Sequence, residues 1–174
     1  MPVYAFDGKI PQIAASAFVH PEAVIIGDVE IGDDCFIAPG AVIRGDFGSI
    51  TLKEGVSFQD NAVIHVDLGG EVVIENDVII GHAALLHDVH IFPRAIIGMG
   101  AVLMFHVVCE EDSFVAAGSV VMQGTRVAAG AIVGGNPARM IKKASEKNIR
   151  DVAEGAALYR ELSRKYRETM RRIS

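Results

Sequence analysis

The sequence predicts an all-β solenoid of about seven triangular coils, followed by a C-terminal α-helix. Three observations support this fold class: aliphatic residues recur every six positions, turn-forming residues recur at the same interval, and a charged amphipathic segment closes the chain. Six-residue units that cannot bury an apolar face alone must stack on one another, which produces a solenoid. We expect two parts, a β-helix over residues 1–136 and a helical segment over 137–174 packed along it.

The six-residue period is strict in two stretches. Its positions all carry an aliphatic side chain or cysteine: Ile25, Ile31, Ile37, Ile43, Ile97, Leu103, Cys109, Val115, Val121, Val127 and Val133. Three residues after each of these, ten of the eleven positions hold Asp, Gly or Asn, which tolerate left-handed backbone and turn the chain. Each unit is therefore predicted to be a short strand with one inward side chain and then a turn, and three units would close one coil.

The period slips between residues 44 and 96. Two local triplets at the six-residue spacing are offset by 22 residues, which is one 18-residue coil plus four: Leu52, Phe58, Ile64 and then Ile74, Ile80, Leu86. The excess predicts a small outward loop at residues 66–70. The same offset stacks Ile64 under Leu86, and it therefore places His65 under His87 and Asp60 under His82.

The stacked histidines suggest a metal site. His65 and His87 would lie on adjacent coils about 4.8 Å apart, close enough to share one ion. His82 cannot easily join them from the same chain, because five extended residues span about 16 Å. His82 of a neighbouring subunit would complete the site, and three imidazoles with one open position are typical of catalytic zinc. The spacing alone also allows surface scatter of three histidines.

Four polar residues near these histidines are further candidates. Arg44 stands close to Asp46 in sequence, and Gln59 and Asp60 come one turn before His65. A guanidinium beside Asp46 and Asp60 predicts a bidentate ion pair, within the subunit or across an interface. The alternative is a surface salt bridge of little energetic value. Gln59 and Asp60 would be close enough to orient a metal-bound hydroxide.

The end of the chain does not follow the six-residue period of the solenoid. The run Gly134-Gly135-Asn136-Pro137 breaks the period, and Pro137 suits the first turn of a helix. We expect helix from about 138 to 172, with Gly155 as a candidate interruption. Residues 1–138 carry 5 Lys and Arg against 17 Asp and Glu, and residues 139–174 carry 11 against 5. This asymmetry favours a basic helix lying on an acidic body over a nucleic-acid-binding arm.

The sequence also favours a soluble, cytoplasmic protein without a membrane partner. The N-terminal segment lacks the basic and apolar regions of a signal peptide. No apolar run approaches the roughly 18 residues of a membrane span. Cys35 and Cys109 stand 74 residues apart and form no CxxC pair, so we expect reduced thiols.

With these residues in place, the sequence resembles the γ-class carbonic anhydrases of the left-handed β-helix, hexapeptide-repeat superfamily. The matching residues, in the family's order, are Arg44, Asp46, Gln59, Asp60, His65, His82 and His87. The segments HPEAVIIGDVEIG, RGDFGSI and GGNPARMIKK look most like the carnitine-operon and phenylacetate-degradation members. The resemblance covers nearly the whole chain. The hexad alone is unspecific, because acyl- and nucleotidyltransferases share it.

The resemblance implies a left-handed parallel β-helix assembled as a homotrimer with three interfacial sites. Its activity would be the reversible hydration of CO2 to bicarbonate, a lyase reaction. His65 and His87 would bind Zn²⁺ together with His82 of the adjacent subunit. Fe²⁺ or Co²⁺ would be accepted as well, since both bind three imidazoles.

The resemblance also implies roles for the polar residues. Arg44 and Asp60 would form ion pairs at the interface, with Asp46 supporting them. Gln59 would hydrogen-bond the hydroxide that attacks CO2. Tyr159, on the expected helix, is similar to a family tyrosine near the site.

Three departures from the family pattern keep other functions open. Ser57 stands where the better-studied enzymes have Asn, Phe47 stands where the archetype has a proton-relaying Glu, and the loop at 66–71 lacks an acidic excursion. One alternative is acyl-CoA thioester hydrolysis or acyl transfer, with His90 or His106 as a base; the chain has no long inserted loop to enclose CoA. The other is a scaffold that keeps the metal but little activity.

Overall fold

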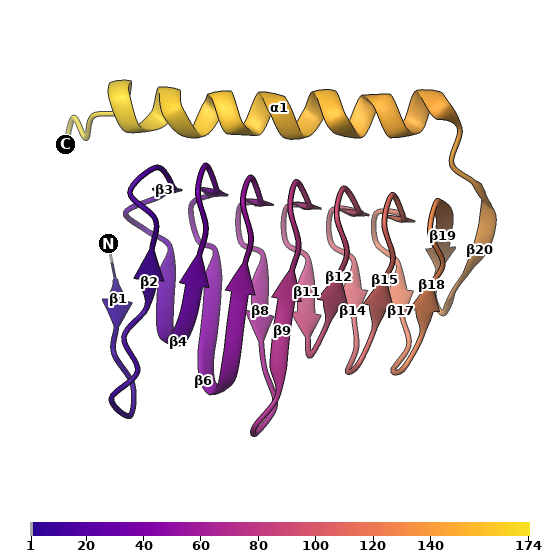
Figure 1. The fold of residues 1–174 in the computed structure, drawn as a ribbon, viewed down its shortest axis with the longest axis horizontal. Coiled ribbons are helices and arrows are strands. Elements are labelled where there is room, and N and C mark those ends of the chain that lie inside the picture. Colours follow the sequence, from indigo (N-terminus) through magenta and orange to yellow (C-terminus); the bar gives the residue numbers. More distant parts are fainter. Residues whose placement is uncertain (1) are drawn as a thin grey trace.

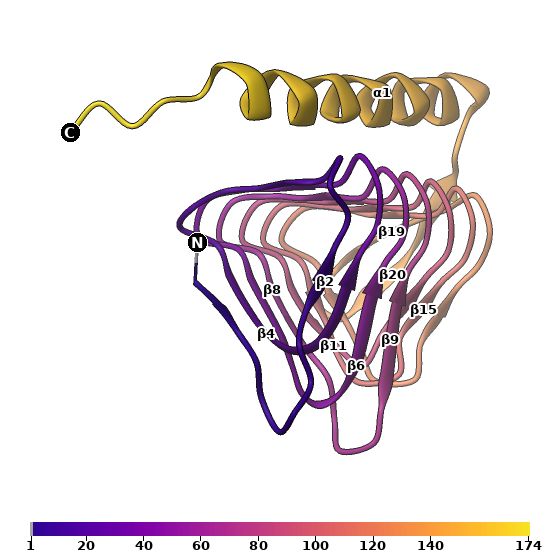
Figure 2. The same ribbon diagram turned by 60° about the vertical axis from the view of Figure 1, so that its left-hand side comes forward.

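The computed structural model describes residues 2–174 and shows a parallel β-solenoid with one long helix laid along it (Figure 1). Figure 2 looks more nearly along the solenoid axis and shows the triangular outline of the coils. Seven strands stack in parallel along one side of the triangle. The prediction of about seven triangular coils is confirmed.

The coils form three sides, and each side is a ladder of short strands. We name one side after the helix that covers it and the other two after strands β8 and β9. The helix-covered face consists of β3 (Phe18–Val19), β5 (Phe36–Ile37), β7 (Ser57–Phe58), β10 (Ile79–Ile80), β13 (Ile96–Ile97), β16 (Phe114–Val115) and β19 (Ala131–Gly135). The β8 face contains β8 (Val63–His65), β11 (Leu85–His87), β14 (Val102–Leu103) and β17 (Val120–Val121). The β9 face contains β9 (Glu71–Ile74), β12 (His90–Ile91), β15 (Val108–Cys109) and β18 (Arg126–Val127).

Two long strands join the β8 and β9 faces near the N-terminus. They are β4 (Val24–Ile31) and β6 (Val42–Leu52), and each continues across the corner between the two faces. The short strands β1 (Val3–Tyr4) and β2 (Gln12–Ile13) pair with β4 and begin the solenoid. Parallel ladders with such short strands stabilise each coil only through its neighbours.

The core is the single column of inward side chains that the hexads predict. All eleven predicted inward residues are buried, with exposed fractions between 0 and 9%. A two-residue strand points one side chain inward and its neighbour outward. Burying an aliphatic side chain of this size contributes about 1.5–3 kcal/mol, so the column supplies most of the driving force for stacking.

The predicted turns are largely confirmed. Eight of the eleven predicted positions have left-handed backbone: Asp34, Gly40, Gly100, His106, Asp112, Gly118, Gly124 and Gly130. Asp28 and Asp46 do not have left-handed backbone, because both lie where the long strands β4 and β6 continue around the corner. The corner in β4 instead turns at Gly27, with φ +80, where a Cβ atom would lie 2.3 Å from the carbonyl oxygen of Gly45.

The irregular middle of the chain has the predicted register. Ile64 pairs with Leu86 and His65 pairs with His87, both 22 residues apart. The outward loop at 66–70 is present between β8 and β9 and protrudes at the bottom of Figure 2. The sequence analysis missed a second protrusion one coil earlier, at residues 46–48, where the pairing of β4 with β6 shifts register. The two protrusions are in contact, since the amide of Gly69 donates to the carbonyl of Phe47 at 2.8 Å.

The expected start of the helix is wrong. Residues 138–143 form strand β20 (Ala138–Lys143), which pairs antiparallel with β19, and α1 spans Glu146–Thr169. The last coil would otherwise leave the edge of β19 unpaired, and β20 covers that edge. Pro137 therefore belongs to the turn between two strands. The helix begins after Ser145, whose side chain accepts from the amide of Asn148 in a capping box.

Helix α1 runs back along the helix-covered face without interruption. Gly155 does not break it; the missing side chain lets the helix approach Ile79, whose Cδ1 would lie 3.3 Å from a Cβ at this position. Towards its C-terminal end, Tyr159 and Tyr166 pack against Phe36. No helix within residues 2–174 has the length and apolar character needed to cross a bilayer.

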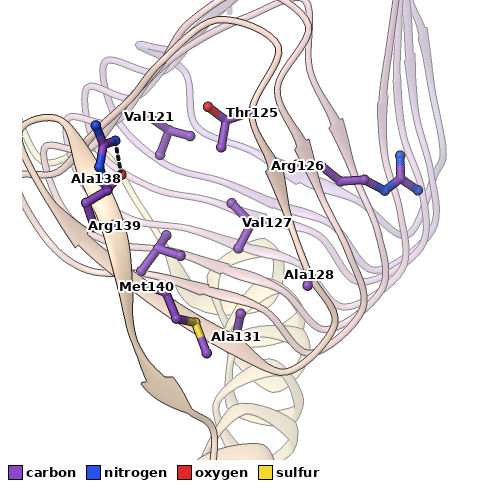
Figure 3. Close-up of a pocket in the computed structure, with 10 residues that line it drawn as sticks. Val121, Thr125, Arg126, Val127, Ala128, Ala131, Ala138, Arg139 and Met140 are labelled. Atoms are coloured by element: carbon purple, nitrogen blue, oxygen red, sulfur yellow. Dashed lines mark hydrogen bonds between the residues drawn. The ribbon is translucent and has the colours of Figure 1, made fainter.

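The far end of the solenoid carries an apolar hollow (Figure 3). It is lined by residues of the last coils and of β20, among them Val121, Val127, Ala131 and Met140. Val121, Val127 and Ala131 belong to the inner surface of the coils, which no further coil covers here. None of the residues predicted for the metal site lines this hollow.

Candidate metal centre

Two histidines and an arginine stand in one ladder at the end of the β8 face. Arg44 on β6 pairs in register with His65 on β8, and His65 pairs with His87 on β11. The three residues therefore project from successive coils at the corner between the β8 and β9 faces. We call this corner, with Arg44, Asp46, His65 and His87, the His65 corner. The predicted stacking of the histidines is confirmed.

Asp46 links two members of this ladder. Its Oδ2 accepts from Nη1 of Arg44 at 2.5 Å, and its Oδ1 lies 2.8 Å from Nε2 of His65. Burial alone would raise the pKa of the Asp46 carboxyl, but the hydrogen bonds from His65 and Arg44, with the Arg44 charge, lower it. An ionised carboxylate only accepts hydrogen bonds. The proton of neutral His65 is therefore held on Nε2.

The remaining nitrogen of His65 faces His87. Nδ1 of His65 lies 3.1 Å from Nε2 of His87, and the two rings are nearly perpendicular. Two nitrogens bound to one zinc at about 2.1 Å in tetrahedral geometry would be about 3.4 Å apart. The contact is a hydrogen bond when Nε2 of His87 carries the proton; when the proton is on Nδ1, two lone pairs meet and a cation between the rings would separate them. The donor chemistry and the spacing of this pair thus fit a divalent metal such as Zn²⁺.

Aromatic side chains flank the histidine pair. The ring of Phe47 lies 5.5 Å from His65, and the ring of Phe105 lies 4.2 Å from His87. Sequence reasoning noted Phe47 only as a departure and missed Phe105, because residue 105 reaches the site from the next coil. These rings make the surroundings of the histidine pair apolar on two sides.

The other predicted residues gather at the opposite edge of the β8 face. His82 lies in the turn before β11, and its Nδ1 is 2.7 Å from Oδ2 of Asp60. Gln59 is buried next to Asp60. The hydroxyl of Tyr159, on α1, has a pKa raised by burial and by the charge of Asp60. We call this group the His82 corner.

The bond to Asp60 orients His82 in the same way as Asp46 orients His65. Because a carboxylate accepts the proton on Nδ1, the lone pair of neutral His82 is on Nε2. The side chain of His82 is 48% exposed, so this nitrogen can reach a second molecule. Metal-binding histidines typically hold their other ring nitrogen against a carboxylate in this manner.

The structure separates some residues that were expected together. Within the chain Arg44 pairs with Asp46, whereas Asp60 pairs with His82. Ser57 lies on β7, fully buried on the helix-covered face, in register with Phe36 and Ile79. Across residues 2–174 of one chain, no three His, Cys, Asp or Glu side chains converge as a metal-binding group.

Of the two histidines that would serve as an acyl-transfer base, only His90 lies apart from this ladder, and His106 lies in the turn one coil beyond His87. His90 is on the β9 face, where its Nε2 is 3.2 Å from Oε1 of Glu75 and its ring stacks on Phe92. His106 is in the turn after β14 and has left-handed backbone. No hydrogen bond joins His90 to His106.

Known proteins resemble this chain over most of its length. The family model for bacterial transferase hexapeptide (six repeats) matches residues 11–45. Mitochondrial gamma carbonic anhydrase 1 of Arabidopsis thaliana is 41% identical over 91% of this chain, which spans only 59% of that relative. Carnitine operon protein CaiE of Proteus sp. is 34% identical over 97% of the chain and 85% of its own length.

A solved structure shows the same architecture. The hexapeptide transferase family protein from Anaplasma phagocytophilum superposes with a TM-score of 0.92 at 38% identity, covering 95% of this chain and 98% of that one. The chain therefore belongs to the hexapeptide-repeat family, in the group that contains the γ-class carbonic anhydrases and the CaiE proteins. Its fold is the left-handed parallel β-helix of that family, opposite in hand to the usual crossover connection.

Proposed function

We propose that this protein is a γ-carbonic-anhydrase-like metalloenzyme that interconverts CO2 and bicarbonate at sites shared between the subunits of a homotrimer. His65 and His87 of one subunit and His82 of the next would hold the metal. Zn²⁺ is the expected ion, and Fe²⁺ or Co²⁺ would fit the same ligands. The cytoplasmic location stays a prediction.

The observation that carries the proposal is the division of the site into two complementary halves. The His65 corner presents two imidazoles at one edge of the β8 face, and the His82 corner presents one imidazole at the other edge. Neither half suffices for a catalytic zinc, which takes three protein ligands. Rotation of one copy onto another can bring the two unlike edges together.

The surface between the two halves supports a trimer. The outward side chains of the β8 face form an apolar row across successive coils: Val42, Val63, Leu85, Val102 and Val120. Leu85 is 46% exposed. A head-to-tail interface repeated by a threefold rotation closes into a ring. Such a ring would bury the apolar row and form three sites.

The chemistry follows from the residues at the two corners. When bound, the cation lowers the pKa of water and so supplies a nucleophile for CO2 at neutral pH. Asp46 and Asp60 hold the outer ring nitrogens of His65 and His82 and so keep the inner lone pairs free. The amide of Gln59, next to Asp60, would orient the attacking oxygen. Phe47 and Phe105 would exclude water from the side facing a nonpolar substrate.

The proposal predicts that two inactive variants complement each other. A His65→Ala chain keeps His82, and a His82→Ala chain keeps His65 and His87. When the two are co-expressed with different tags and the mixed trimers are isolated, one of the three head-to-tail interfaces in each, about a third of the sites, should combine three native histidines. Stopped-flow CO2 hydration and bound zinc should both return to roughly that fraction of the wild-type value, whereas each variant alone should give neither.

A matched control separates complementation from general stabilisation. His65→Ala co-expressed with a doubly substituted His65→Ala, His82→Ala chain can form no complete site, so activity and zinc should stay absent. Full activity of the His82→Ala variant alone, or no recovery in mixed trimers that have formed, would refute the shared site.

A second candidate function is acyl transfer or thioester hydrolysis. It is favoured by the similarity to a protein described as a member of the hexapeptide transferase family. This chemistry would need a base without metal. Acyl-CoA turnover that survives both chelation and His65→Ala would favour it over CO2 hydration. A metal-loaded trimer without either activity would instead indicate a scaffold.

A further inference from the structure

We propose that Asp88 is a positioning residue for the metal site: its buried carboxylate holds the proton of His87 on Nδ1 and so directs the Nε2 lone pair towards His65. This inference rests on the proposed metal site, and it assigns a role to a residue that the sequence analysis did not single out. Asp88 directly follows His87 and is 6% exposed.

Two unsatisfied polar atoms face each other at this position. Oδ2 of Asp88 lies 3.4 Å from Nδ1 of His87. Both atoms are buried, and neither has any other hydrogen-bond partner among residues 2–174. A buried polar atom without a partner costs about 1–3 kcal/mol. Hydrogen bonds at functional sites are often long before the ligand binds and shorten afterwards, so these two atoms are each other's natural partner.

The rest of Asp88 is held firmly on both neighbouring coils. Its backbone is left-handed, with φ +49. Its amide donates to the carbonyl of His65 at 3.3 Å, and its carbonyl accepts from the amide of His106 at 2.7 Å. Its Oδ1 accepts from the amide of Asp67 at 2.9 Å. The carboxylate is therefore fixed in place, and Oδ2 is the one oxygen left to face His87.

The outward loop at 66–70 is built around this carboxylate. A Cβ atom at Gly70 would lie 2.8 Å from Oδ1 of Asp88, so the loop can approach only with glycine there. The loop thus does more than absorb four extra residues, because its Asp67 amide anchors the carboxylate beside a metal ligand.

With Asp88 included, all three candidate ligands follow one pattern. Asp46 holds Nε2 of His65, Asp60 holds Nδ1 of His82, and Asp88 faces Nδ1 of His87. Carboxylates in this position fix the tautomer of a ligating histidine and raise its basicity, and their loss typically weakens metal affinity by about 10–100-fold.

The test compares two substitutions of Asp88. In Asp88→Asn, the amide oxygen can still accept from Asp67, while the NH2 group faces His87 and can only donate. His87 is then driven to the opposite tautomer, with the proton on Nε2. Nitrogen-15 NMR of the metal-free protein should show Nδ1 of His87 protonated in wild type and unprotonated in Asp88→Asn. Zinc affinity, measured by chelator competition, should fall about 10–100-fold.

Two further variants make the result decisive. Asp88→Gly suits the left-handed backbone and removes the carboxylate, so it should also weaken zinc binding if Asp88→Asn does not fold. Asp112→Asn is the matched control, because Asp112 occupies another left-handed turn but pairs with Arg94. It should leave the tautomer of His87 and the zinc affinity unchanged.

Wild-type zinc affinity in both folded Asp88 variants, or a wild-type His87 with its proton on Nε2, would overturn the inference. A tautomer switch in a protein that binds no zinc even as wild type would support the orienting role of Asp88 and overturn the proposed metal function. The two proposals therefore fail separately.

Discussion

Asp46 shows how a single side chain can organise a candidate site. One of its oxygens accepts from Arg44 and the other faces Nε2 of His65, so a single carboxylate orients both side chains. Asp60 orients His82 in the same way, through the contact between its Oδ2 and Nδ1 of His82. In each case the carboxylate decides which imidazole nitrogen carries the lone pair, and the choice is made before any metal binds.

Two buried thiols illustrate the residue scale away from the site. Cys109 belongs to the inward column and Cys35 is buried in the same core, and burial raises the pKa of each thiol to about 12. A thiolate is the reactive form of cysteine. Both thiols should therefore be inert to alkylation in the native protein at pH 8.

The thiols also predict an alkaline loss of stability. Their folded pKa values lie above the unfolded value of about 8.5, so the stabilisation is fully present below that pH and is lost as pH rises towards 12. Each thiol should steepen the decline by about 1.4 kcal/mol per pH unit. Urea unfolding at pH 8–11 measures this slope, and Cys109→Ala should make it shallower. An unchanged slope would contradict the assignment.

At the scale of elements, α1 is attached to the solenoid by a charged contact as well as an apolar one. Nε of Arg160 donates to Oδ1 of Asp77 at 2.8 Å, and Nη1 donates to Oε1 of Glu54 at 2.5 Å. Asp77 and Glu54 stand on neighbouring coils, so one guanidinium ties two coils to the helix. This contact realises the predicted pairing of a basic helix with an acidic body.

We expect Arg160→Ala to loosen α1 from the solenoid. The side chain is 22% exposed, and loss of its charged hydrogen bonds should cost about 1–2 kcal/mol of unfolding free energy. Amide hydrogen exchange should accelerate along α1 and much less in the inner strands. Arg150→Ala is the control, because Arg150 is 64% exposed and, among residues 2–174, pairs only with Glu146, at 3.7 Å. Equal effects of the two substitutions would argue against the contact.

At the scale of the whole molecule, the three faces of the prism differ in what covers them and in the outward side chains that they carry. One is covered by α1 of the same chain. The β9 face mixes polar and apolar outward residues, among them Glu30, Thr51, His90 and Arg126. The β8 face presents the apolar row, with the His65 corner at one edge and the His82 corner at the other. This division explains why oligomerisation and the site belong to one proposal.

The apolar row predicts which face holds the trimer together. Val102 on β14 and Val108 on β15 are both partly buried outward residues of two-residue strands in adjacent sides of the solenoid. Val102→Asp would place a charge in the proposed interface, so light scattering should report monomers and zinc should be lost. Val108→Asp should leave a zinc-loaded trimer. Trimers in both variants would exclude the β8 face as the interface.

Several features of the site were open to prediction because the solenoid converts sequence spacing into spatial register. An offset of 22 residues sufficed to place His65 under His87 and Asp60 beside His82. Other features depended on contacts that no spacing encodes. Strand β20 forms because the edge of β19 needs a partner, and Ser57 is buried because α1 covers its face.

The sequence by itself determined the coil, the inward column and the stacking of the histidines, because a six-residue repeat leaves each side chain only one place in a parallel ladder. Only the tertiary structure decided where the helix begins, that the protrusions at 46–48 and 66–70 meet, and that Asp88 faces His87. These outcomes arise from packing between segments, where a free edge, a close approach of backbones or a buried charge selects the partner.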